Sequence, residues 1–117
     1  MTLDEFKDLV NKHRPVGYAF GEFKTDTPDY RFGNPQQAVA MIYKAQTSSV
    51  VFTFRVGFTQ LLIDKFNQLG ALAKKHPDKN IKDMFLVTID KNAFSEEMLA
   101  LLEESIVRAL RQFYQAN

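Results

Sequence analysis

The chain has 117 residues, 45% of them hydrophobic and 25% charged, and this ordinary globular usage excludes collagen-like, low-complexity and wholly disordered proteins. Fifteen lysines and arginines against fourteen acidic residues leave a net charge of +1, so no global field points to nucleic acid or to an anionic membrane. The absence of cysteine excludes disulfides, thiolate metal sites and thiol nucleophiles. A length near the usual domain size predicts a single domain over residues 1–117.

The first residues predict a helix over residues 2–13. Thr2 and Glu5 have the spacing of a capping box, an apolar stripe follows them, and Pro15 should end the helix. This acidic start is unlike a secretory signal or a transit peptide. No apolar run approaches the ~20 residues of a membrane span. We therefore expect a cytoplasmic protein that makes no membrane contact.

Large and small side chains alternate over residues 16–24 and predict a strand, whose small face lets a helix pack closely or leaves a groove. Residues 25–36 predict a long irregular loop, because they contain a Gly-Asn-Pro sequence typical of turns. Within this loop, Tyr30 and Phe32 flank Arg31 and form an aromatic platform with a cation. Such a group binds a base, a peptide or a carboxylate, or its aromatic rings simply hold the loop against the core.

Two further strands are predicted at residues 38–44 and 50–56, joined by a polar connection of hairpin length. The second alternates most regularly and should turn one set of side chains to the core: Val50, Phe52, Phe54 and Val56. Its other set should face away: Val51, Thr53 and Arg55. Three successive strands with short connections favour an antiparallel meander with one exposed face.

The remaining elements are a helix, a strand and a helix. Residues 59–75 predict a long helix stopped by a His-Pro pair, and residues 83–90 predict an interior strand because both faces are apolar. Residues 95–114 predict a final helix with Ser95 as its N-cap. The order α-β-β-β-α-β-α predicts an α+β fold, a two-layer sandwich in which helices pack on one face of a small, mainly antiparallel sheet.

The sequence contains no recognisable catalytic motif, so we expect a non-enzymatic protein without catalytic residues, metal or cofactor. His13 and His76 precede prolines at predicted helix ends, where an imidazolium helps to cap carbonyl groups. Cations gathered on one surface would point to contacts with nucleic acid or another partner. The candidates, with Tyr30 and Phe32 as accompanying loop aromatics, are Arg31, Lys44, Arg55, Lys74, Lys75, Lys79 and Lys82. Dispersed surface lysines are the alternative interpretation.

Several stretches resemble the MmcQ/YjbR family of small bacterial proteins. They are residues 2–6, residues 30–33 leading into 38–43, and residues 84–90 followed by 95–105. The resemblance implies a CyaY-like, that is frataxin-like, α+β fold and DNA as a partner. It names no catalytic residue.

Two other classes of function stay open. Fifteen aromatic residues, among them Phe113 and Tyr114 near the C-terminus, would suit a protein-interaction or chaperone-like module that acts as a homodimer. A small-ligand-binding protein or an enzyme, with its pocket beneath residues 25–36, is the third class. Cations on one face would favour DNA, a large exposed apolar patch would favour a partner protein, and a deep polar pocket would favour a ligand.

Overall fold

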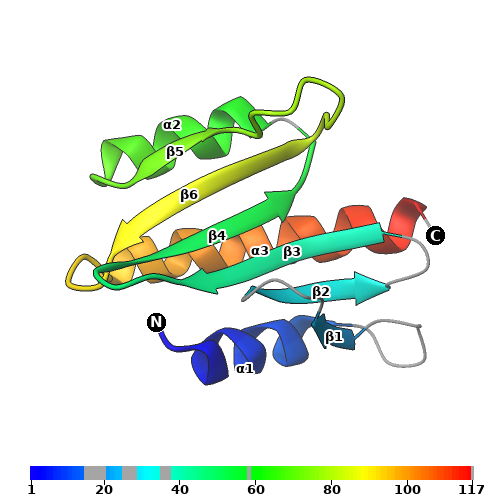
Figure 1. The fold of residues 1–117 in the computed structure, drawn as a ribbon, viewed down its shortest axis with the longest axis horizontal. Coiled ribbons are helices and arrows are strands. Elements are labelled where there is room, and N and C mark those ends of the chain that lie inside the picture. The colour runs from blue at the N-terminus through cyan, green and yellow to red at the C-terminus, as the bar shows by residue number, and fades with distance from the viewer. Residues whose placement is uncertain (15–20, 25–28, 35–37, 58, 117) are drawn as a thin grey trace.

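The computed structural model of the protein describes residues 1–14, 21–24, 29–34, 38–57 and 59–116. These residues form three helices and a six-stranded sheet (Figure 1). The helices pack on one face of the sheet, so the predicted two-layer α+β sandwich is confirmed. No helix in the described parts of the chain is long and apolar enough to cross a membrane.

The predicted elements follow one another in the predicted order, and two short strands are added to them. In chain order the elements are α1 (Leu3–His13), β1 (Gly21–Lys24), β2 (Tyr30–Asn34), β3 (Ala38–Ala45), β4 (Ser49–Arg55), α2 (Thr59–Gln68), β5 (Leu72–Lys75), β6 (Met84–Asp90) and α3 (Glu96–Ala116). All neighbouring strands are antiparallel, in the order β1-β2-β3-β4-β6-β5. The predicted interior position of β6 is therefore confirmed. The first half of the strand predicted over residues 16–24 lies outside the described residues.

The core lies between the sheet and the helices and is rich in phenylalanine. Phe52 and Phe54 of β4 and Phe85 of β6 point to the helix side, where each is fully buried. Phe6 of α1 packs over them, with its ring 5.4 Å from that of Phe52 and 5.3 Å from that of Phe32. The capping box at Thr2 forms as predicted and fixes the start of α1. The alternation predicted for β4 is also confirmed, since Val51, Thr53 and Arg55 lie on the opposite face.

Residues 25–36 do not form one long loop, because β2 occupies residues 30–34 and pairs with β1 and β3. The turn-like glycine that suggested a loop lies at an irregularity of the ladder, where the β2–β3 register shifts after Phe32. Gly33 has φ +154°, and a Cβ there would lie 2.4 Å from the carbonyl oxygen of Ala38. The glycine thus allows β3 to approach β2 closely within the sheet.

The helix predicted over residues 59–75 is too long. Gly70, at φ +93°, follows the last turn of α2, and glycine favours this left-handed conformation that ends helices. The chain then returns as β5 along β6. The side-chain amide of Asn67 donates to the carbonyl of Ala73 at 3.1 Å and accepts from its N–H at 2.8 Å. These two bonds satisfy backbone groups of the outermost strand that would otherwise be free to pair with another chain.

Candidate functional site

The face of the sheet away from the helices is open and carries a hollow of about 430 Å³. Every strand from β2 to β6 contributes to it. Its lining residues are Asp29, Arg31, Ile42, Lys44, Gln46, Val51, Thr53, Leu72, Lys74, His76, Leu86 and Thr88. We call this hollow the open-face site.

The floor of the open-face site is aliphatic. Cross-strand pairing places Thr53 of β4 between Ile42 of β3 and Leu86 of β6, so these three side chains share one row. Val51 and Thr88 form the next pair along the same strands. Thr53 is buried and the other floor residues are half-buried, whereas Leu72 on the edge strand β5 keeps 74% of its surface exposed. The site therefore offers apolar contact area beside hydroxyl groups.

Three predicted contact cations surround this floor: Arg31 on β2, Lys44 on β3 and Lys74 on β5. Lys44 and Lys74 are exposed, and neither forms an ion pair with a described residue. Arg31 lies 3.5 Å from the carboxylate of Asp29, which is buried beside it. The Nε of Arg31 is also buried and has no hydrogen-bond partner among the described residues. Among the described residues that line the hollow, Asp29 is the one acid.

Arg55, another predicted contact, lies on the same face of β4 but outside the hollow. Its Nε donates a hydrogen bond of 3.0 Å to the carbonyl oxygen of Val39. Because Val39 belongs to β3, this bond braces the two central strands at one end of the sheet.

The other predicted lysines border a second hollow of about 440 Å³ next to the open-face site. Lys75, Lys79 and Lys82 line it together with two acidic residues, Asp78 and Asp83. These two acids reduce the positive potential of the second hollow, whereas the lining of the open-face site contains a single carboxylate among the described residues, that of Asp29.

His76 lines both hollows and connects them. It follows β5 and not a helix, so its predicted role in capping a helix end is wrong. Its Nδ1 instead accepts the backbone N–H of Asp78 at 3.1 Å. His76 thus stabilises the turn between β5 and β6 at the boundary of the two hollows.

The aromatic pair of residues 30–32 does not belong to the open face. Phe32 is only 3% exposed and packs on Phe6, and Tyr30 is half-buried with the ammonium group of Lys7 5.7 Å from its ring centre. Both point to the helix side, because side chains alternate along β2 and Arg31, which lies between them, lines the open-face site. Of the two interpretations of this segment, its structure supports the one in which the aromatic rings hold it to the core.

Large exposed hydrophobic side chains are aliphatic in the described part of the chain: Leu61, Leu69 and Leu72. Phe113, expected as a possible dimer contact, is 6% exposed and belongs to the core. All three lie within the helix predicted over residues 59–75, which ends at Gln68 in the structure.

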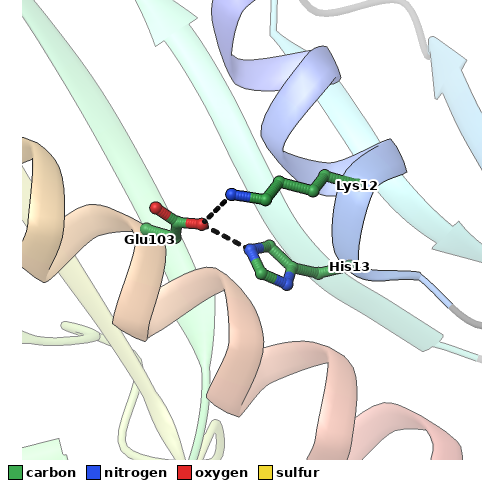
Figure 2. Close-up of polar contacts among 3 residues, drawn as sticks. All are labelled: Lys12, His13 and Glu103. Carbon is green, nitrogen blue, oxygen red and sulfur yellow. Dashed lines mark hydrogen bonds and ion pairs between the residues drawn. The ribbon is translucent and has the colours of Figure 1, made fainter.

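On the helix side, Glu103 of α3 joins α1 to the rest of the fold (Figure 2). One of its carboxylate oxygens accepts from Lys12 at 3.1 Å and lies 2.5 Å from Nε2 of His13. The hydrogen bonds from His13 and Lys12 lower the pKa of Glu103 below its ordinary value. His13 is the last residue of α1 as predicted, but its partner lies 90 positions away and no local pattern identifies it.

Among the described residues, no group of three or more histidines and acidic side chains is arranged to hold a metal ion. The chain matches no family model, no curated protein and no solved structure.

Proposed function

We propose that this protein is a binding domain for single-stranded nucleic acid, which lies across the open-face site. The observation that carries the proposal is the convergence of Arg31, Lys44 and Lys74 from three different strands around one apolar floor. These cations are distant in sequence. In the sheet, β5 is the fourth strand from β2, and neighbouring strands lie about 4.8 Å apart, so the cations span roughly 19 Å across the sheet.

The chemistry of the site suits an extended single strand better than a duplex. Phosphate groups need cations, which the rim supplies, and exposed base faces need an apolar surface, which Ile42, Val51 and Leu86 supply. A duplex hides its base faces and would use only the rim. Because the described floor is aliphatic and not aromatic, we expect binding with little sequence preference.

Fluorescence anisotropy with a labelled oligothymidine, titrated at increasing salt, tests this proposal. Three phosphate contacts should make log affinity fall against log salt with a slope of about −2 for a single strand. The double variant Lys44→Glu/Lys74→Glu leaves one of these cations, so the magnitude of the slope should fall to less than about 1. Its affinity at low salt should fall at least about tenfold.

The matched control is the double variant Lys65→Glu/Arg111→Glu, which makes the same change in net charge on the helix side. Lys65 and Arg111 both lie on helices, away from the open face. The control should keep the wild-type slope. Absence of binding at low salt with about 100 μM protein would refute the proposal, because even non-specific affinity should be detectable in that range. Equal losses in the two double variants would refute the assignment to the open face.

A second candidate function is association with another copy of the chain through the same face. The 74% exposure of Leu72 favours it, because a large aliphatic side chain in that position gains most from being covered. Sedimentation velocity over a range of protein concentrations measures this association directly. A dimer that the Leu72→Lys variant converts to monomer, together with no binding of oligothymidine, would favour this second function. The family resemblance implies DNA as the partner and stays a prediction.

A further inference from the structure

A groove lies between α1 and α3, on the side of the sheet opposite to the open-face site. The two helices run side by side in the same direction on the helix side of the sheet (Figure 1). The cavity between them has a volume of about 560 Å³. Leu9 of α1 and Leu99 and Ala100 of α3 form its apolar floor. We call it the helical groove.

Both leucines are half-buried and pack against the core, so the floor of the groove is held in place from below. The small side chain of Ala100 leaves the space open. The lining positions on α3 run from residue 96 to 103, which corresponds to about 10 Å along the helix axis. A groove of this length takes about two turns of an added helix.

The groove is also fixed at one end by the shared carboxylate of Glu103, which binds Lys12 and His13 of α1 (Figure 2). The capping box between Thr2 and Glu5 orders the other end of α1. These contacts hold α1 and α3 in position without a bound partner. A surface formed in advance loses less conformational entropy on binding than one that must order.

The walls of the helical groove are acidic. Glu5 and Asp8 on α1 and Glu96 on α3 are exposed at its rim. Of the cations present, Lys12 is already paired with Glu103, and the amino group of Met1 lies close enough to interact with Glu5. Asp8 and Glu96 form no ion pair with a described residue, so the rim carries net negative charge, in contrast to the open-face site.

We propose that the helical groove docks a cationic amphipathic helix of a partner protein, with its leucine-type side chains on the floor and its lysines or arginines against the acidic rim. An apolar groove flanked by carboxylates is complementary to such a helix in both shape and charge. This inference does not depend on the nucleic-acid proposal, because the groove and the open-face site lie on opposite sides of the sheet.

The probe is a capped peptide of about 14 residues in which leucine and lysine alternate with helical spacing, and isothermal titration calorimetry measures its binding. A peptide with glutamate in place of every lysine is the first control. We expect saturable binding of the lysine peptide only, with NMR shift changes centred on Leu9 and Leu99. The open-face variant Lys44→Glu/Lys74→Glu should bind it as the wild type does, so the two proposals fail or hold separately.

Two variants test the position of the site. Asp8→Lys reverses a rim charge and Ala100→Arg fills the floor, and each should weaken binding of the lysine peptide about tenfold. Both positions are exposed, so the fold should persist, which circular dichroism checks. Asp64→Lys, an exposed helical aspartate on α2 that does not line the groove, is the matched control and should change affinity less than twofold. Equal weakening by Asp8→Lys and Asp64→Lys, binding of the glutamate peptide, or no saturable binding would overturn the proposal.

Discussion

The two faces of the sheet differ in how their charges are used. On the helix side, several cations form ion pairs: Lys7 lies 2.9 Å from Glu22, Lys12 lies 3.1 Å from Glu103, and Arg108 lies 3.3 Å from Glu104. On the open side, Arg31 lies 3.5 Å from Asp29, but Lys44 and Lys74 are exposed and have no carboxylate partner among the described residues. Exposed ion pairs add little to stability, so this pairing mainly neutralises the covered side. The unpaired cations of the open side stay available for an anionic partner.

The two faces also differ in their apolar side chains. The covered face uses phenylalanine, with Phe52 and Phe54 stacked 6.3 Å apart below Phe6. The open face uses aliphatic residues and threonines, and its most exposed member is Leu72. An antiparallel sheet commonly buries one face and leaves the other in water. The stability of the fold should therefore depend on one face, while the other is free to serve binding.

Truncating one large side chain on each face provides the strongest test of this division. Phe6→Ala removes a fully buried ring that lies against four described rings, so it should lower the free energy of unfolding by about 3–5 kcal/mol. Leu72→Ala removes a side chain that is 74% exposed and should cost less than about 0.5 kcal/mol. Urea denaturation measures both. A comparable loss in the two variants would mean that the open face is covered in solution.

A smaller effect is expected at the glycine that sets the register between β2 and β3. In Gly33→Ala the new Cβ would meet the backbone of Ala38, so either the strands separate or strain remains, at a cost of about 1–3 kcal/mol. Since β2 sends Phe32 to the core and Arg31 to the open face, separation of the strands would disturb both faces together. The midpoint of thermal unfolding and the affinity for oligothymidine should then both decrease.

The matched control for that variant is Gly21→Ala in β1, where an added Cβ would meet nothing within 4 Å. It should leave the unfolding midpoint almost unchanged. A Gly33→Ala protein as stable as the control would show that the close approach of β3 to β2 is not a constraint on the fold.

Most of the fold was predictable because the hydrophobic alternation of its strands is regular. Val50, Phe52 and Phe54 identify both the strand and its buried face, and residues 84–90 identify the interior strand through apolar side chains on both faces. The errors lie at β2 and β5. Residues typical of turns led to the prediction of a loop where β2 lies. Apolar residues at helical spacing led to a predicted helix that continued through Gly70 into the residues of β5. A glycine in a helical stripe was the signal that could have ended the helix correctly.

The open-face site was predicted only in part. The sequence identified Arg31, Lys44 and Lys74 as candidate cations. It could not show that they line one hollow, because they are far apart in sequence and the pairing of three different strands brings them together. Leu72 was assigned to a helix, so its exposure could not be anticipated. The helical groove left no local signal either, because it depends on the packing of α1 against α3, and the residues that hydrogen-bond between these helices are 90 and 91 positions apart.

The smallest expected effect concerns the ion pair that links α1 to α3 on the covered side. The pKa of Glu103 is lowered from 4.5 in the folded protein by His13 and Lys12, so its carboxylate stabilises the fold above about pH 4.5. As the pH falls through the lowered folded pKa, the carboxylate becomes protonated and this contribution is lost. The group is partly exposed, so solvent screening should keep the contribution below about 1 kcal/mol.

Urea denaturation between pH 3 and 7 tests this contribution. The free energy of unfolding should fall less steeply with decreasing pH for Glu103→Gln than for the wild type. The Glu97→Gln control, an exposed acid of α3 outside the contact, should keep the wild-type pH profile. Identical profiles for Glu103→Gln and wild type would exclude this contact as a pH-dependent link between the two helices.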